Sequence, residues 1–97
     1  MTTKTTTTAA AAAAATVEVS AFAAARAALG WSQHRVVLDA GASVADVVAR
    51  LAQEAPGAAP VLARCALLLD GRRVADAASA VVPDGARLDL LPPFAGG

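Results

Sequence analysis

Hydrophobic and polar residues begin to alternate at residue 16, after an N-terminal segment that has no such pattern. The alternation has a period of two, which is typical of a β-strand with one buried face, and its apolar positions are Val17, Val19 and Ala21. Residues 23–29 are mostly alanine with one arginine and have high helix propensity, and Gly30 follows where a helix commonly ends. The pattern therefore predicts a strand that leads directly into a short helix.

The clearest helical pattern lies in the middle of the chain. Residues 35–39 contain a β-branched pair and end near a glycine, which predicts a second strand that pairs with the first. Over residues 44–54 the apolar side chains recur at helical spacing, at Val44, Val47, Val48 and Leu51. Ser43 and Asp46 have the spacing of a capping box, and Pro56 lies where the helix should end.

The next segment is predicted to form two further strands. After a loop through Pro60, residues 65–69 form a continuous apolar run, which favours a central strand buried on both faces. The pair Asp70-Gly71 is a hairpin signal, so residues 72–74 are expected to return as a short strand.

The last predicted strand covers residues 87–91. It follows a turn at residues 83–85, and it alternates so that Leu88 and Leu90 point toward the core. The full order of elements predicts an α+β fold: a mixed sheet of four to five strands with one main helix and a short second helix. Pattern alone does not determine the order of the strands in that sheet.

Composition limits the possible functions. Eight basic and eight acidic residues balance to a net charge of zero and are scattered, which disfavours nucleic acid and anionic membranes as partners. The single cysteine, Cys65, cannot form an internal disulfide and is predicted to be a small buried hydrophobe. No cluster of metal-binding residue types is visible, so no metal site and no bound cofactor are predicted.

Residues 1–15 are rich in threonine and alanine and are predicted to be a disordered tail. The apolar part of this tail is much shorter than the roughly twenty residues that span a bilayer. The chain is therefore expected to be cytoplasmic, with a folded domain over residues 16–91.

The chemistry is predicted to lie at the C-terminus, in a flexible tail over residues 92–97. Pro92 and Pro93 keep the exit from the last strand extended, and Gly96 and Gly97 have no Cβ and can pass through a narrow channel. The terminal carboxylate is the one group that could readily be presented inside a partner's active site.

Two segments resemble the MoaD/ThiS family of ubiquitin-like sulfur carriers, and particularly the small subunit of molybdopterin synthase. They are Val17-Glu18-Val19-Ser20-Ala21-Phe22-Ala23-Ala24-Ala25-Arg26 and Leu90-Leu91-Pro92-Pro93-Phe94-Ala95-Gly96-Gly97. The resemblance covers about residues 16–97 and implies a β-grasp (ubiquitin-like) fold.

The resemblance also implies a role for each tail residue. In the family, the terminal glycine is adenylated and then converted to a thiocarboxylate, which on this chain would be Gly97. The tail residues that would enter the partner are Pro92, Pro93, Phe94, Ala95 and Gly96. The implied partners are a ubiquitin-activating-type adenylyltransferase, which supplies ATP and the adenylation site, and the large subunit of molybdopterin synthase. The chain would then be a sulfur-donating cosubstrate that delivers sulfur to a cyclic pyranopterin.

Three other functions stay open at this point. The same thiocarboxylate could serve thiamine or cysteine synthesis, or Gly97 could form isopeptide bonds as a protein modifier. The chain could also be a β-grasp binding module with a frayed terminus. His34 is predicted to be a surface residue in a loop with no partner for acid–base chemistry, and no catalytic role is predicted for it.

Overall fold

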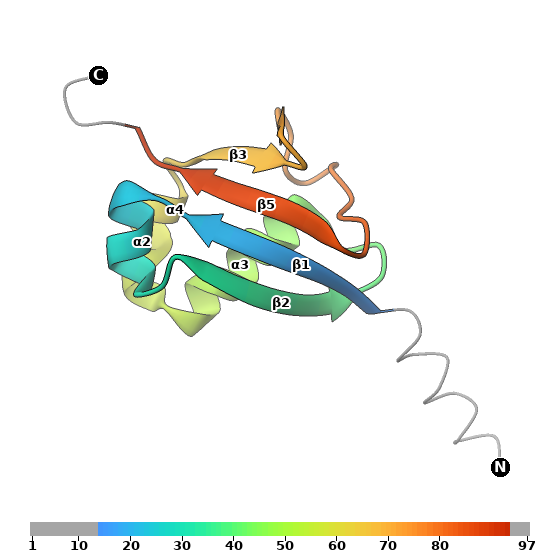
Figure 1. The fold of residues 1–97 in the computed structure, drawn as a ribbon, viewed down its shortest axis with the longest axis horizontal. Helices are drawn as coiled ribbons and strands as arrows, with labels where there is room; N and C mark the ends of the chain where they lie inside the picture. The colour runs from blue at the N-terminus through green and yellow to red at the C-terminus, as the bar shows by residue number, and fades with distance from the viewer. Residues whose placement is uncertain (1–13, 94–97) are drawn as a thin grey trace, which may run out of the picture.

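The computed structural model describes residues 14–93, and its organising element is a five-stranded mixed sheet in the order β2-β1-β5-β3-β4 (Figure 1). Its elements are β1 (Ala14–Ala21), α2 (Ala23–Leu29), β2 (Gln33–Asp39), α3 (Val44–Glu54), η1 (Pro56–Ala58), α4 (Ala59–Leu62), β3 (Ala66–Leu69), β4 (Arg72–Arg73) and β5 (Ala86–Leu91). β1 and β5 are parallel, and the other neighbouring strands are antiparallel. The predicted α+β, β-grasp architecture is confirmed.

The first strand and helix form where the alternation and the alanine-rich segment predicted them. β1 begins at Ala14, two residues before the predicted start, and Ala15 is already buried. The predicted tail therefore overlaps the strand at these two residues. β2 pairs with β1 as expected and begins at Gln33, also two residues early. α2 ends at Gly30, whose φ of 87° is readily adopted by glycine.

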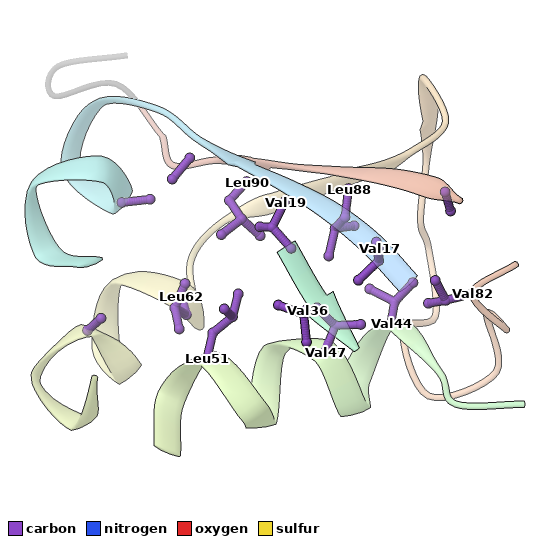
Figure 2. Close-up of a cluster of buried hydrophobic side chains, with 14 residues drawn as sticks. Val17, Val19, Val36, Val44, Val47, Leu51, Leu62, Val82, Leu88 and Leu90 are labelled. Atoms are coloured by element: carbon purple, nitrogen blue, oxygen red, sulfur yellow. The ribbon is translucent and has the colours of Figure 1, made fainter. Parts of the chain in front are cut away.

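Helix α3 covers one face of the sheet and supplies much of the core (Figure 2). Its bounds, Val44–Glu54, match the prediction, and its buried side chains are Val44, Val47 and Leu51. They meet inward-facing side chains of the strands, among them Val17, Val19, Val36, Leu88 and Leu90. Because these positions alternate along each strand, one face of the sheet is packed and the other is left open.

The predicted capping box at the start of α3 is present in full. The Asp46 backbone N–H donates to the Ser43 hydroxyl over 3.2 Å, and the Ser43 backbone N–H donates to the Asp46 carboxylate over 2.8 Å. These bonds satisfy two backbone donors that the first turn of a helix leaves unpaired.

We predict that Ser43→Ala lowers the free energy of unfolding by about 1 kcal/mol, the usual cost of losing an N-cap side chain. Urea unfolding followed by circular dichroism measures this loss. Ser43→Asp keeps an acceptor at the cap and serves as the control, with an expected loss smaller than that of alanine. Equal losses for the two variants would contradict the capping role.

The segment after α3 is more ordered than the predicted loop. Pro56 and Pro60 each occupy the first turn of a short helix, η1 and α4, where a missing N–H does no harm. Ala58 and Leu62 from these turns are buried in the core. The prediction of a loop through Pro60 was therefore wrong, because proline begins these helices instead of excluding them.

Strand β3 also differs from its prediction. It lies second from the edge, its four residues are all half-buried, and the central strand of the sheet is β5. Leu67 and Leu69 pack against the core, whereas Ala66 and Leu68 occupy the alternate positions on the open face. An apolar run cannot show whether one or both faces of a sheet are covered, and here helices cover only one.

Both predicted turns are present: one joins β3 to β4, and the other precedes β5. Asp70 and Gly71 have φ values of 50° and 84°, as a tight hairpin turn of the I′ type requires. The Asp70 carboxylate also accepts the Arg87 backbone N–H over 2.9 Å, which ties this turn to β5. Within residues 14–93, no helix is long and apolar enough to cross a membrane.

Candidate functional site

The end of β5 is held on both sides up to the point where the C-terminal segment leaves the fold. Leu91 pairs with Ala66 of β3, and on the other side the Phe22 backbone N–H donates to the Leu90 carbonyl over 3.3 Å. Pro92 is buried and Pro93 is exposed. Because proline has no N–H to donate, the strand ladder ends at Leu91. The chain therefore leaves the sheet at a well-anchored position.

The predicted site residues fall into two groups. Pro92 and Pro93 follow β5 directly, as the sequence predicted. Four others lie outside the described residues: Phe94, Ala95, Gly96 and Gly97. Their roles as a docking tail and a reactive terminus therefore stay predictions.

The exit of the chain lies beside α2 (Figure 1). Since β1 and β5 run parallel, the C-terminal end of β5 lies next to the connection from β1 into α2. Phe22 occupies this connection and is 41% exposed, which makes it one of the few large apolar side chains on the surface of residues 14–93. Phe22 and α2 therefore lie beside the point where the chain leaves the sheet.

Ala23, which follows Phe22, has an unusual backbone conformation. Its φ of 51° lies in the left-handed region, where a Cβ atom costs about 1–2 kcal/mol. The strained residue turns the chain from β1 into α2, so that Ala25 and Arg26 donate their backbone N–H groups to the Phe22 carbonyl. Strain of this kind often accompanies a functional surface.

We predict that Ala23→Gly raises the free energy of unfolding by up to about 1 kcal/mol, because glycine relieves the left-handed strain but loses more backbone entropy on folding. Chemical denaturation measures the change. Ala24→Gly, one residue further into the helix, is the matched control and is expected to lower stability by about 0.5–1 kcal/mol. A loss of stability in both variants would contradict the strain at residue 23.

Charged residues line the open face of the sheet. An Arg35 terminal nitrogen lies 3.6 Å from a Glu18 carboxylate oxygen across β2 and β1, and the Arg87 Nε donates to Asp89 over 3.2 Å along β5. Ser20 lies among them with only 2% of its surface exposed. Alternation in the sequence put Ser20 on the outer face, but no signal in the sequence showed that neighbouring side chains would bury it.

Cys65 is poorly suited to sulfur chemistry of its own. Its thiol is half-buried and donates to the Val61 carbonyl over 3.4 Å, and desolvation by burial raises the pKa of Cys65. A raised pKa reduces the fraction of thiolate, the reactive form, at neutral pH. The interpretation of Cys65 as a packing residue agrees with this environment.

The other chemistry-bearing side chains of the folded part form no catalytic cluster. His34 Nε2 lies 3.5 Å from a Glu54 carboxylate oxygen, and its ring lies 5.0 Å from that of Trp31. This group joins β2 to the end of α3, and β2 is separated from β5 by β1. Within residues 14–93, no three histidine, cysteine or acidic side chains lie close enough to hold a metal ion.

Comparison with models of known protein families shows to which family the chain belongs. The model of the ThiS family matches residues 19–97, which include the end of β1, every later element of the fold and the terminal glycines. The chain belongs to the ThiS family. The resemblance to MoaD/ThiS ubiquitin-like sulfur carriers, predicted from two short segments, is thereby confirmed. Among curated proteins, no sequence matches significantly.

Solved structures of three relatives share the fold of this ThiS family member. The Haloferax volcanii HVO 2177 protein is 29% identical, with a TM-score of 0.77 over 88% of this chain and 89% of that one. SAMP1 from Haloferax volcanii is 26% identical, with a TM-score of 0.74 over 84% and 99%. A chain from the complex of subunits 1 and 2 of the molybdopterin-converting factor of Helicobacter pylori is 26% identical, with a TM-score of 0.57 over 84% and 99%.

Proposed function

We propose that this ThiS family protein carries sulfur as a thiocarboxylate on Gly97 and delivers it to a cyclic pyranopterin during molybdopterin synthesis. The observation that carries the proposal is that the family match runs through Gly97, beyond a strand end that is anchored on both sides. This arrangement separates a rigid domain, which a partner can recognise, from a terminus that a partner can bind in its active site.

The proposed chemistry takes place on the terminal carboxyl group. A carboxylate oxygen of Gly97 attacks the α-phosphorus of ATP, and pyrophosphate leaves. Hydrosulfide (HS⁻) supplied by the donor then attacks the glycyl carbonyl carbon, AMP leaves, and the S–H proton is released to solvent. The product is a thiocarboxylate, whose sulfur can attack the substrate. ATP and the sulfur donor belong to the activating system, and this chain supplies only the carboxyl group.

The proposed partners are an adenylyltransferase of the ubiquitin-activating type and the large subunit of molybdopterin synthase. The second partner is supported by the relative from Helicobacter pylori, whose structure is a complex of two molybdopterin-converting factor subunits. The open face of the sheet, Phe22 and α2 surround the exit of the chain and provide a surface on which either partner could dock.

A second function is favoured by another relative. SAMP1 is 26% identical over nearly its whole length, and a further structure of the Haloferax volcanii protein carries the name small archaeal modifier protein 1. A modifier forms an isopeptide bond between its terminal glycine and a lysine of another protein. Conjugation in cells would give adducts of higher mass, whereas a dedicated carrier stays free.

The deciding experiment is intact-mass measurement after incubation with ATP, a sulfide source and an adenylyltransferase. The expected product has one oxygen replaced by one sulfur, and fragmentation places the change on Gly97. Cys65→Ser is the control, because a persulfide on Cys65 would add a sulfur atom without removing oxygen. Exchange in both proteins supports the proposal. A mass gain that needs Cys65 would overturn it.

A further inference from the structure

A small cavity opens on the open face of the sheet, close to the exit of β5. Its volume is about 170 Å³, and its lining comes from β1, α2, β2 and β5. The side chains that bear on its chemistry are Ser20, Phe22, Arg26, Gln33 and Arg87. Hydrogen-bond donors dominate this set, and Phe22 adds an exposed apolar wall. The cavity therefore suits an anionic group attached to something larger.

Ser20 gives independent evidence that the cavity lacks a partner group. It is 98% buried, since only 2% of its surface is exposed, and its Oγ has no hydrogen-bond partner among residues 14–93. Burying a hydroxyl without a partner destabilises a protein, because the hydroxyl loses its hydrogen bonds to water. Ser20 lines an open cavity, so a ligand in the cavity that formed a hydrogen bond with the hydroxyl would remove this destabilisation.

The two arginines have donors to spare. Arg87 uses its Nε for Asp89, and no hydrogen bond within residues 14–93 uses its two terminal nitrogens. Arg26 is exposed on α2 and forms no ion pair with any residue between 14 and 93. A guanidinium group matches the two oxygens of a carboxylate, and such charge-assisted bonds are about twice as strong as neutral ones.

We propose that the cavity receives an aspartate or glutamate side chain of the activating enzyme. Arg26 and Arg87 bond to the carboxylate oxygens, and the Ser20 hydroxyl donates to one of them. This inference rests on the proposed function, because it assigns a docking contact to the enzyme that adenylates Gly97. It explains why an unpartnered hydroxyl and unused arginine donors lie next to the strand that leads to the reactive terminus.

The surroundings favour a protein side chain over a free anion. Phe22, at 41% exposure, forms one wall of the cavity and faces solvent. Arginine and aromatic side chains are the residues that contribute most to binding energy at protein interfaces. An enzyme that holds the C-terminus must approach the end of β5, so its surface comes to lie over this cavity.

The test compares the affinity of three variants for the adenylyltransferase that converts the wild-type chain. Arg26→Glu is expected to weaken binding by at least about tenfold, since it replaces an attraction by a repulsion. Arg72→Glu, which makes the same change on β4 at the far edge of the sheet, is the matched control and is expected to stay within about twofold.

Ser20→Ala separates a binding role from a structural one. Removing an unpartnered hydroxyl is expected to leave the urea midpoint unchanged or to raise it, yet to weaken binding by about threefold or more. A residue that only supported the fold would show the opposite pattern, with lower stability and unchanged affinity.

Several results would overturn the inference. If Arg26→Glu binds the enzyme with wild-type affinity, or if Arg72→Glu weakens binding equally, then Arg26 makes no specific contact with a carboxylate of the enzyme. Inorganic phosphate that shifts the Ser20 and Arg26 amide NMR signals and competes with the enzyme would make the cavity a free-anion site. Similar shifts on deleting residues 94–97 would make the chain's own terminus the occupant.

The two proposals fail in different ways. If the wild-type chain gains sulfur and Arg26→Glu binds normally, only the docking contact is wrong. If no activating enzyme transfers sulfur to the wild-type chain, the proposed function fails, and the docking contact fails with it.

Discussion

Deleting Gly97 is expected to abolish thiocarboxylate formation and to leave the stability of the domain unchanged. The sheet is complete at Leu91, and the described packing ends at Pro93, so a residue beyond these positions is expected to add little to the free energy of unfolding. The loss of sulfur transfer is expected to be complete, because the terminus of the shortened chain falls one residue short of the adenylation site.

Two measurements check this expectation together. Intact mass after incubation with ATP, sulfide and the adenylyltransferase reports sulfur transfer, and urea unfolding reports stability. Gly97→Ala keeps the chain length and is the matched control: it retains the carboxylate but adds a Cβ where a narrow channel is proposed, so its rate should lie between those of the wild type and the deletion. A shortened protein that still exchanged oxygen for sulfur at the wild-type rate would show that Gly97 is not the carrier position.

Replacing Leu51 by alanine is expected to have the largest effect on stability. Leu51 is fully buried on α3 and lies in the core between that helix and the sheet (Figure 2). Truncating a buried leucine costs about 2–5 kcal/mol, because the lost transfer free energy is added to the cost of a cavity. A domain of this size has a total stability of about 5–15 kcal/mol, so the variant loses a large share of it.

Fluorescence of Trp31, the single tryptophan, provides the signal for this measurement, because Trp31 packs against the core. Val37→Ala on β2 is the control. Val37 is 52% exposed, so its truncation is expected to cost less than about 1 kcal/mol. Similar losses at the two positions would mean that α3 does not pack as the structure describes.

The elements with strong local signals were predicted well. The bounds of α3 followed from apolar spacing and a complete capping box, and Gly30 marked the end of α2 because its left-handed conformation favours glycine. The inward positions of Leu88 and Leu90 followed from strict alternation in β5. Each of these signals depends on residues close together in the sequence, and tertiary contacts did not change the structure that they predicted.

The remaining features depend on contacts between distant segments. The apolar run in β3 has the same composition whether one or both of its faces are covered, and the order of strands came from the family resemblance alone. Pro56 was correctly predicted to follow the end of α3, but the segment through Pro60 was predicted to be a loop, although proline suits the first turn of a helix. In the candidate site, the tail residues were predicted from the sequence, whereas the burial of Ser20 depends on side chains from other strands.

The central position of β5 also bears on how the chain is made. β5 is the last strand to be synthesised, yet it pairs with β1 on one side and β3 on the other. A chain whose synthesis stops before residue 86 therefore lacks the middle strand, and its sheet cannot form completely. Such a product exposes its core residues to proteases and chaperones. The copies that are expected to persist are therefore those translated at least through β5.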